Sequence, residues 1–447
     1  MQTDFANIFL VPFEDKFLLH APLHGVTSLL NARLADEIRH SLAVGKLNGA
    51  SALARPLIEP LLKPASTSFS RSGEFAPSQV RLVTTNDCNL RCLYCAPDAG
   101  AGDCSHMTVG ICELALRYQA DVVRRNAYDT LDVYYLGGEP FFAWNIVQFC
   151  DETGRRLAEE LGVTFGSSCT TNAFLSEEQA RWVGQHLSLV MVSLDGPGDI
   201  HDQYRVTRSG GRTHAVVARS LRIFEAEGLP YVLRCSVDNF MAERLPEIVE
   251  YFCREFHPAA INIEPLYNEG RCRKSALELP EPAVFVGAVV RAGQIARQRG
   301  VKLKLNTANV EHLGESNCGV CEDSFTVSPD GVVSSCCGVN HRKSAHAADY
   351  AIGEVDVGAR TVRIDSSKVE RVRTYGVSNI PRCRNCLAKY HCSGGCRVFH
   401  SPPFCDAPPN QMCQITQNLT LWRILECLQL FAEADRVALD PQEDVCG

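Results

Sequence analysis

The stretch Val80-Arg-Leu-Val-Thr-Thr-Asn-Asp-Cys88-Asn-Leu-Arg-Cys92-Leu-Tyr-Cys95 joins a β-rich run directly to a loop with the spacing C-x3-C-x2-C. Three thiolates on one short loop can bind one face of an iron–sulfur cubane, whose irons favour thiolate ligands. Three ligands for four irons leave one iron open for a substrate. A zinc site is the weaker alternative, because zinc ligands usually come in two separated pairs. The sequence therefore predicts an iron–sulfur cluster at Cys88, Cys92 and Cys95.

This first run is one of six β-rich runs that alternate with helical stretches. One helical stretch, Thr108 to Arg125, places Val109 and Cys112 on its apolar face. Six strands alternating with helices predict an α/β fold with a parallel sheet, open or closed into a barrel. In such folds the chemistry lies in loops at the carboxyl ends of strands, where the three cysteines stand. The runs are Val80–Thr85, Leu131–Leu136, Val163–Thr170, Leu189–Leu194, Tyr231–Val237 and Ala260–Leu266.

The regions on either side of these runs differ in composition. The N-terminal region reads as a small α/β unit, with strands at Asn7–Phe13 and Lys16–His20 and a helix at Ser28–Leu42. A stretch rich in Ser and Pro follows it and is the expected linker. The predicted division is an accessory domain (1–63), the linker (64–78), the barrel (79–275), a bridging helix (281–299) and strand within 276–315, a cysteine-rich region (316–413), and a helix (Thr416–Ala434) and tail within 414–447.

The composition limits the classes of function. With 44 Lys and Arg against 52 Asp and Glu, the net charge of −8 argues against nucleic acid or an anionic membrane as main partner. No run of 18 or more apolar residues is present, and acidic residues flank the first apolar stretch, so neither a membrane span nor a signal peptide is expected. The 22 cysteines in so large a chain indicate metal ligands or burial in a reducing cytoplasm rather than disulfides.

The cysteine loop resembles the signature of radical S-adenosylmethionine (SAM) enzymes, including the aromatic Tyr94 before its last cysteine. The second strand ends in Gly137-Gly138-Glu139-Pro140, which is similar to the GGEP motif of that family. The resemblance implies that the six strands form a partial (β/α)6 barrel. It also implies that Gly137, Gly138 and Pro140 belong to the SAM site. The glycines would let the backbone approach the methionine end of SAM, and Glu139 would meet its amino group.

A third motif ends the fourth strand. Ser193-Leu194-Asp195-Gly196-Pro197, followed by Ile200-His201-Asp202-Gln203-Tyr204-Arg205, resembles the SLDGP and IHDxxR stretch of the same family. Polar groups at this strand end reach SAM in the family, which makes Ser193 and Arg205 candidate contacts; a purely structural role is the alternative. Thr171-Asn172-Ala173 stands where relatives often have Thr-Asn-Gly, a mild departure.

The resemblance also implies a mechanism. The open iron chelates the amino and carboxylate groups of SAM, and an electron from the reduced cluster breaks a carbon–sulfur bond. The products are methionine and a 5′-deoxyadenosyl radical, which abstracts hydrogen from an unactivated C–H bond. A small redox protein is the expected electron donor. The task of the protein is to orient the reactants and to exclude water.

The downstream cysteines resemble the SPASM extension of peptide and sulfatase maturation enzymes, which holds two auxiliary [4Fe–4S] clusters. Their spacing is C-x2-C, then G-x4-C, then C-x2-C-x5-C-x3-C. Two structural zinc ions are the alternative that the spacing alone leaves open. Carried over position by position, the resemblance assigns Cys318, Cys321, Cys336 and Cys396 to the first auxiliary cluster, and Cys383, Cys386, Cys392 and Cys413 to the second, with Cys405 as alternative last ligand.

Other cysteines fall into two groups. Cys337 and Cys405 stand beside the assigned ligands and are the candidate catalytic residues, as hydrogen donors; a spare ligand or a bystander is the alternative for each. A second group lies in apolar periodic segments and is expected in the core. Its members are Cys112, Cys150, Cys169, Cys235 and Cys253.

In the family, two auxiliary clusters usually accompany modification of a peptide or protein. In anaerobic sulfatase-maturating enzymes an Asp follows the cysteine of the G-x4-C element and acts as base, whereas Cys337 stands there in this chain. The resemblance therefore favours maturases of ribosomally made peptides, which form thioether or carbon–carbon cross-links or epimerise residues. Residues 1–63 would recognise a leader peptide by strand addition, or serve only in packing. The alternatives are sulfatase-like oxidation, a small-molecule radical SAM oxidoreductase and a non-enzymatic zinc scaffold.

Overall fold

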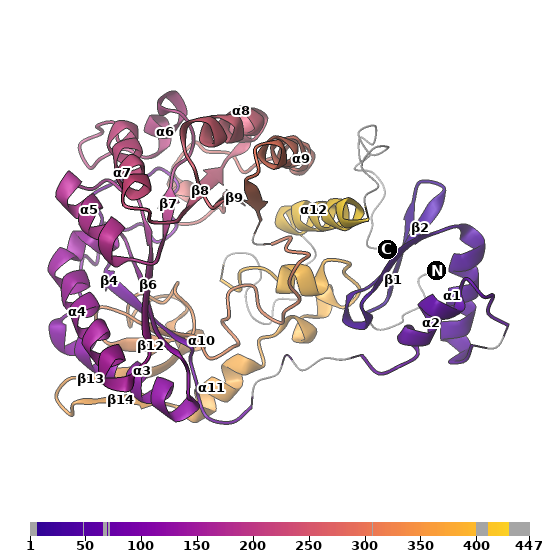
Figure 1. Cartoon of the computed structure of the whole chain (residues 1–447), viewed down its shortest axis with the longest axis horizontal. Coiled ribbons are helices and arrows are strands. Elements are labelled where there is room, and N and C mark those ends of the chain that lie inside the picture. The colour runs from indigo at the N-terminus through magenta and orange to yellow at the C-terminus, as the bar shows by residue number, and fades with distance from the viewer. Residues whose placement is uncertain are drawn as a thin grey trace.

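The computed structural model describes residues 7–47, 49–65, 69, 72–305, 307–398 and 410–428. Figure 1 shows a large curved sheet with helices on its outer side. The cysteine-rich segment and helix α12 (Gln411–Cys427) face the open side of this sheet, and the N-terminal unit lies beyond them. The sheet is therefore the frame on which the other parts are placed.

The six expected β-rich runs all form strands, and they lie side by side in sequence order with parallel pairing. Alternate side chains such as Val80, Leu82 and Val133 are fully buried in the core, which is the pattern that makes these segments strands. A seventh parallel strand extends the sheet beside the sixth. The strands are β4 (Gln79–Thr85), β5 (Thr130–Gly137), β6 (Thr164–Thr171), β7 (Leu189–Ser193), β8 (Tyr231–Val237), β9 (Ala260–Pro265) and β10 (Lys302–Lys304).

Helices cover the outer face of this sheet (Figure 1). Helix α3 begins where it is predicted, because the Thr108 side chain accepts a hydrogen bond from the Ile111 N–H. Val109 is 45% exposed, so its expected place on the apolar face is wrong: it stands in the first turn, before the buried residues begin. The bridging helix is confirmed as α9. The helices are α3 (Val109–Asn126), α4 (Trp144–Leu161), α5 (Glu177–His186), α6 (Gly198–Tyr204), α7 (His214–Ala226), α8 (Asn239–Glu255) and α9 (Pro282–Gln298).

The cysteine-rich segment continues the main sheet, which the sequence does not indicate. Strand β11 (Phe325–Val327) pairs in parallel with β4, and three antiparallel strands follow it. Strands of three residues are too short to show a period of two in the sequence. The further elements are β12 (Val332–Ser334), β13 (Ala351–Asp356), β14 (Thr361–Ile364), α10 (Ala347–Tyr350), α11 (Ser366–Arg373), η4 (Val377–Asn379), η5 (Pro381–Cys383) and η6 (Lys389–Ser393).

Helix α12 begins earlier than the predicted start at Thr416. The Asn410 side chain accepts a hydrogen bond from the Cys413 N–H and so caps the helix before Gln411. The last residues of the predicted helix, 429–434, lie outside the described residues. Cys413 therefore stands in the first turn of a helix.

The N-terminal unit is a three-stranded antiparallel sheet with two helices, and its two predicted strands are confirmed. The predicted helix Ser28–Leu42 is wrong at its start, because Val26–Leu30 pair with the second strand and bury Leu30. The helix begins only after Asn31, whose side chain caps it. The elements are β1 (Phe9–Phe13), β2 (Lys16–Ala21), β3 (Val26–Leu30), η1 (Pro22–His24), α1 (Ala32–Val44) and α2 (Arg55–Leu61).

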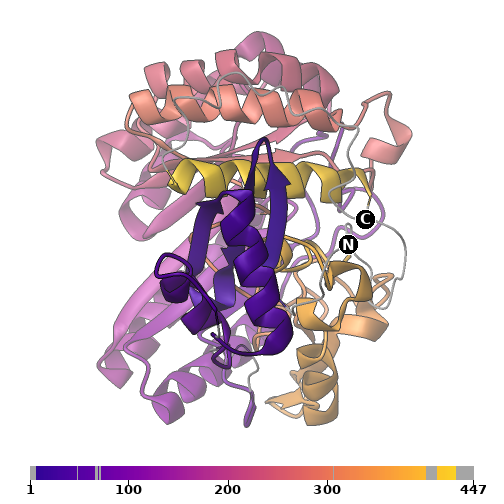
Figure 2. The same cartoon turned by 90° about the vertical axis from the view of Figure 1, so that its right-hand side faces the viewer.

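One face of this small sheet packs against α12, which lies directly behind it in Figure 2. Phe9 and Leu18 share an apolar cluster with Leu421 of α12. On β2, the buried His20 ring contacts the buried His391 ring of η6, with 2.9 Å between their Nε2 atoms. The packing role expected as one alternative for this unit is therefore observed.

The expected linker, 64–78, forms neither helix nor strand in those of its residues that the structure describes. Throughout the described part of the chain, no helix combines the length and the apolar character needed to cross a membrane. The cysteines in these same residues are all free thiols.

Candidate functional site

The cysteine loop leaves the carboxyl end of β4 and is fixed by backbone hydrogen bonds to the segment around the end of α6. The N–H groups of Arg91 and Leu93 donate to the carbonyl oxygens of Val206 and Tyr204, at 2.8 and 2.9 Å. The loop therefore lies at the sheet edge where parallel α/β folds carry their chemistry, as the sequence predicts.

The thiols of this loop are enclosed by apolar side chains. Cys88 and Cys92 are buried in a cluster with Leu90, and Phe174 packs against it. Burial raises the pKa of Cys88 to about 12, and the charge of Glu139 adds to the effect. Such thiols ionise at neutral pH only when a bound cation compensates the negative charge, so these buried thiols suit metal ligands.

The donor groups around Cys88 test whether a cluster fits here. The Leu90 N–H donates to Cys88 Sγ at 3.4 Å, and Asn172 Nδ2 donates to it at 3.7 Å. Hydrogen bonds to sulfur are typical of iron–sulfur ligands. Buried thiols with such donors around them suit the thiolate ligands of an iron–sulfur cluster, and the binding of a cluster by these three cysteines stays a prediction.

Gly137 and Gly138 bring the end of β5 against the start of the cysteine loop. The Gly138 N–H donates to Thr85 O at 2.9 Å, and the Glu139 N–H donates to Asp87 O at 3.0 Å. A Cβ on Gly138 would lie 2.2 Å from the Asp87 carbonyl oxygen, so no larger residue fits. The motif supports the cysteine loop, and its contact with SAM stays a prediction.

The Glu139 carboxylate is buried and accepts three hydrogen bonds. Asn172 N donates at 2.7 Å, Thr171 Oγ1 at 2.8 Å and Phe141 N at 3.2 Å. Burial raises the pKa of Glu139 to about 7, and these donors oppose the shift. Pro140 follows it and starts η2 (Pro140–Ala143). Glu139 therefore links the end of β5 to the end of β6. Its contact with the SAM amino group, which the resemblance implies, stays a prediction.

A buried network joins the cysteine loop to the end of the fourth barrel strand. The Tyr94 hydroxyl donates to Asp195 Oδ2 and accepts a hydrogen bond from Arg205 at 2.6 Å. Arg205 lies 3.9 Å from Asp195, which is fully buried. Burial raises the pKa of Asp195, and the Arg205 charge opposes this. The sequence singled out Tyr94, Ser193 and Arg205 as candidate contacts. It missed Asp195, although this residue lies inside the quoted motif. Ser193 ends β7 and is buried.

One atom of this network lacks a partner. Arg205 Nε is buried and makes no hydrogen bond within the described residues. An unsatisfied buried donor costs about 1–3 kcal/mol, which an anionic ligand at the site would relieve. Since the Arg205 charge also acts on Cys92, the orphaned donor lies near the cysteine loop and fits the carboxylate of SAM.

The cysteines assigned to the first auxiliary cluster come from separate segments around β11 and β12. Cys318 and Cys321 precede β11, Cys336 follows β12, and Cys396 follows η6. Burial raises the pKa of Cys318 to about 11, and the charges of Cys337 and Cys396 add to it. The fold therefore brings these thiols close together, and their binding of a cluster stays a prediction.

Cys337, one of the two candidate catalytic residues, directly follows Cys336 beyond the end of β12 and is exposed. A hydrogen bond from Cys336 lowers the pKa of Cys337 to about 6; burial opposes this, and the charges of Arg81 on β4 and Arg234 on β8 support it. Cys405, the other candidate, lies outside the described residues.

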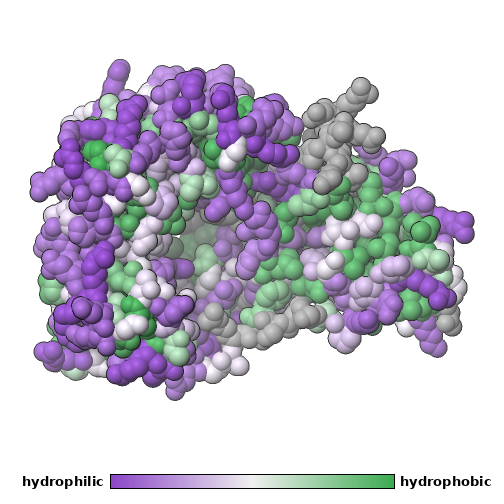
Figure 3. Space-filling model, viewed as in Figure 1, coloured by the Kyte–Doolittle hydropathy of each residue, from purple (hydrophilic) through white to green (hydrophobic). Residues whose placement is uncertain are grey.

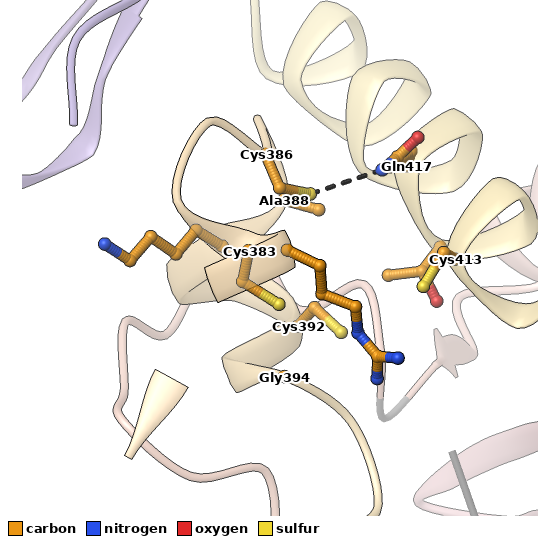
Figure 4. Close-up of a pocket in the computed structure, with 10 residues that line it drawn as sticks. Cys383, Cys386, Ala388, Cys392, Gly394, Cys413 and Gln417 are labelled. Atoms are coloured by element: carbon orange, nitrogen blue, oxygen red, sulfur yellow. Dashed lines mark hydrogen bonds between the residues drawn. The ribbon is translucent and has the colours of Figure 1, made fainter. Parts of the chain in front are cut away.

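The cysteines assigned to the second auxiliary cluster line a single pocket (Figure 4). Cys383, Cys386 and Cys392 come from the segment around η5 and η6, and Cys413 from the first turn of α12. Gln417, one turn further along α12, donates from Nε2 to Cys386 Sγ at 3.4 Å. The sequence missed Gln417, because no spacing connects it to a thiol 31 residues away.

The five cysteines expected in the core lie there. Four of them are at most 1% exposed and belong to the main core, and the fifth packs against it partly buried. They behave as small apolar residues, which separates them from the loop and pocket cysteines. In this order they are Cys112, Cys150, Cys169, Cys235 and Cys253.

Comparison with known proteins connects this geometry to a family. Residues 82–251, from β4 to α8, match the model of the Radical SAM superfamily. The cysteine-type anaerobic sulfatase-maturating enzyme of Clostridium perfringens (strain 13 / Type A) is 22% identical over 347 residues, which are 74% of this chain and 91% of that protein.

Two solved structures share the fold. Native anSMEcpe with bound AdoMet and Cp18Cys peptide superposes with a TM-score of 0.60 at 18% identity, over 79% of this chain and 100% of that chain. Streptococcus suis SuiB bound to precursor peptide SuiA superposes with a TM-score of 0.50 at 14% identity, over 91% and 98%. The predicted partial (β/α)6 barrel is thereby confirmed.

Proposed function

This chain belongs to the radical SAM superfamily, and from that premise we propose that it modifies a peptide substrate. The superfamily's [4Fe–4S] cluster and SAM together supply, when bound, a 5′-deoxyadenosyl radical that takes a hydrogen atom from an unactivated carbon. Cys88, Cys92 and Cys95 would hold this cluster. The observation that carries the proposal is the Tyr94 hydroxyl, which bonds both Asp195 and Arg205 and so joins the cysteine loop to an unsatisfied cationic donor.

The chain's own residues bind and orient the cofactor. Arg205 would offer its free Nε–H to the carboxylate of SAM, while Tyr94 and Asp195 hold the guanidinium in place. Glu139 keeps the ends of β5 and β6 together, and it would accept a hydrogen bond from the SAM amino group. The apolar wall of Leu90 and neighbouring residues excludes water from the reacting atoms.

A peptide substrate is supported by the proteins that this chain resembles. Its relative in Clostridium perfringens is a sulfatase-maturating enzyme, and the structures of anSMEcpe and SuiB both hold a peptide. Cys337 in place of the expected Asp favours cross-linking or epimerisation over sulfatase-type oxidation. In epimerisation, the deoxyadenosyl radical would take the Cα hydrogen of a peptide residue, and the Cys337 S–H would return a hydrogen atom from the other side. The resulting Cys337 thiyl radical would be restored to the thiol by one electron from an auxiliary cluster and one proton from solvent.

The auxiliary cysteines complete the proposal. One further [4Fe–4S] cluster would be held by Cys318, Cys321, Cys336 and Cys396. Another would be held by the four thiols that line the pocket of Figure 4, Cys383, Cys386, Cys392 and Cys413. In oxidative cross-linking the substrate loses two hydrogen atoms. One leaves on the deoxyadenosyl group; the other leaves as a proton, and its electron passes to the auxiliary clusters. A small redox protein in a reducing cytoplasm would reduce the first cluster.

The N-terminal sheet would bind the leader part of such a peptide. One edge of the sheet is β1, which carries Pro12 and so lacks one backbone donor. The other edge is β3 (Val26–Leu30), which holds no proline and suits strand addition better. Deleting residues 1–63 would expose the apolar face of α12, so hydrogen exchange of β3 with and without peptide is the cleaner test. Unchanged exchange would contradict leader binding there.

The experiment that tests the proposal is coexpression of this protein with a candidate precursor peptide, in light and in heavy water. A mass loss of about two daltons means oxidative cross-linking. An unchanged mass in light water, with about one solvent deuteron at carbon in heavy water, means epimerisation, and replacing Cys337 by Ala should then stop it. No change in either culture, together with turnover of SAM on small molecules, would contradict the proposal.

A further inference from the structure

Arg397 is a buried cation that the proposed chemistry does not use. It directly follows Cys396 in the chain and is only 3% exposed. Its Nη1 donates to Gly394 O and its Nη2 to Glu315 O, both at 3.4 Å. Its Nε is buried and has no hydrogen-bond partner. Both acceptors are carbonyl groups and both bonds are long, so they hold the guanidinium only weakly.

No carboxylate balances this charge within the described residues, where Arg397 forms no ion pair. The Glu315 carboxylate is bonded to Ser378 instead, whose N–H and hydroxyl donate to it at 3.0 and 2.6 Å. By contrast, Arg373 is a buried guanidinium of the same region that is paired. Its Nε and Nη2 donate to the two carboxylate oxygens of Asp323, at 3.0 and 2.9 Å. An unpaired buried charge is far more costly than a paired one, so Arg397 calls for a further anion close to it.

The contacts of Arg397 place it between the two sets of auxiliary cysteines. Gly394, which accepts one of its hydrogen bonds, lines the thiol pocket of the second set (Figure 4). Glu315, which accepts the other, begins the segment that leads to Cys321 of the first set. Burial raises the pKa of Cys321 to about 12 and also raises that of Cys383, and the charge of Arg397 opposes both shifts. One guanidinium thus acts on thiols of both sets.

The surroundings of Arg397 contain little that could screen its charge. A Cβ on Gly394 would lie 2.8 Å both from Arg397 Cζ and from Ile380 Cδ1, so the guanidinium packs beside an apolar side chain. Ile380 in turn packs against a buried cluster of Val377 and Tyr390. In Figure 3 the surface over α12 and the adjoining N-terminal unit is largely apolar. Electrostatic interactions are strong in such surroundings.

We propose that Arg397 is the shared counter-charge of the two auxiliary clusters, an inference that rests on the proposed function. A [4Fe–4S] cluster with four thiolate ligands carries a net negative charge, which grows when the cluster is reduced. A buried cation beside it therefore favours the reduced form and raises the reduction potential. Arg397 acts through the clusters and raises both potentials together, whereas Gln417 contacts a ligand of the second cluster alone.

The test measures the reduction potentials of the auxiliary clusters in the full-length, iron-loaded protein, without SAM or peptide. Anaerobic redox titration followed by electron paramagnetic resonance gives them, and a variant with all three loop cysteines replaced by Ala identifies the auxiliary signals. Arg397→Met removes the charge and keeps an unbranched side chain. At a fixed potential, the ratio of reduced to oxidised cluster should fall about tenfold at both auxiliary sites, a shift of about 59 mV for a one-electron couple. The cluster of the cysteine loop should keep its potential.

Two further variants assign the shift to the buried charge. Arg397→Lys keeps the charge, so its potentials should stay closer to the wild type than those of Arg397→Met. Arg371→Met is the matched control, because Arg371 is exposed on α11 and also donates to carbonyl oxygens, those of Ala348 and Asp349. Unshifted potentials in Arg397→Met, a shift at one auxiliary cluster only, or an equal shift in Arg397→Lys or Arg371→Met would overturn the proposal.

Iron content keeps the outcomes separable. If Arg397→Met loses auxiliary iron while Arg397→Lys keeps it, the positive charge is needed to hold the clusters, which supports the proposal. Loss of iron in both variants would leave Arg397 a packing role and overturn it. A wild type without auxiliary clusters would overturn this inference together with the auxiliary part of the proposed function. Failure to modify a peptide, with both clusters present and both potentials shifted in Arg397→Met, would count against the proposed function alone.

Discussion

The barrel strands β4 to β9 and the segment 377–396 are held together by different physical means. In the strands, alternate side chains are fully buried against helices, and each strand is hydrogen-bonded to its neighbours. The segment 377–396 contains only short helical turns, η4 to η6, and its apolar clusters are small and shared with other parts of the chain. Four cysteines line a pocket there, and the proposed cluster in it would replace a core, which is the use that small domains make of metals.

The largest expected effect concerns the barrel side of this comparison. Replacing Cys92 by Ala removes a ligand from a loop that the barrel positions, so formation of 5′-deoxyadenosine from SAM should fall by about a thousandfold or more. Cys253→Ala is the control, because Cys253 is a partly buried helix residue. Liquid chromatography of the anaerobic reaction measures both. Retained activity in Cys92→Ala would show that the loop does not bind the cluster.

Removal of iron should separate the two regions. Hydrogen exchange after anaerobic chelation should rise in residues 377–396 and in α12, because the pocket whose thiols come from both segments would lose its proposed cluster. Strands β4 to β9 should keep their protection, since their core does not depend on metal. A uniform rise over the whole chain would contradict the comparison, and an unchanged pattern would argue against a cluster in that pocket.

A smaller effect is expected from the network behind the cysteine loop. Tyr94→Phe removes the hydroxyl between Asp195 and Arg205, so SAM should bind about tenfold more weakly, as loss of a charge-assisted hydrogen bond implies. Tyr128→Phe is a matched control, because it loses one hydrogen bond, to Ala76 O, far from the site. Isothermal titration with SAM compares them. Equal affinities for SAM in the two variants would show that the Tyr94 network does not contribute to SAM binding.

The smallest effect tests the pocket of the cysteine-rich region. Gln417→Leu removes an N–H donor from Cys386 Sγ, which should lower the potential of the second auxiliary cluster by tens of millivolts, the equivalent of about 1 kcal/mol. Gln414→Leu, on the exposed face of the same helix, should leave it unchanged. Redox titration followed by electron paramagnetic resonance (EPR) measures both. Unshifted potentials in Gln417→Leu would contradict the assignment of Cys386 as a cluster ligand.

Much of the barrel could be predicted, because each strand is long enough to show buried alternation. The missed elements lack such a signal: β11 and β12 have three residues each, and Val26–Leu30 fits helical spacing as well as strand pairing. In the site, ligand spacing marks the cysteines, but it does not mark partners that reach them from distant segments. Asp195 and Gln417 are of this kind, since only the folded chain brings them to Tyr94 and Cys386.

The central claim is that one cluster, at Cys88, Cys92 and Cys95, has an iron open to SAM, whereas the four-cysteine sites are closed. EPR spectroscopy of the reduced protein with and without SAM tests it most directly. The account predicts that SAM shifts one signal, that the auxiliary signals stay unchanged, and that the shifting signal is missing when all three loop cysteines are replaced by Ala. No shift with SAM, or a shift that persists in the triple variant, would contradict it.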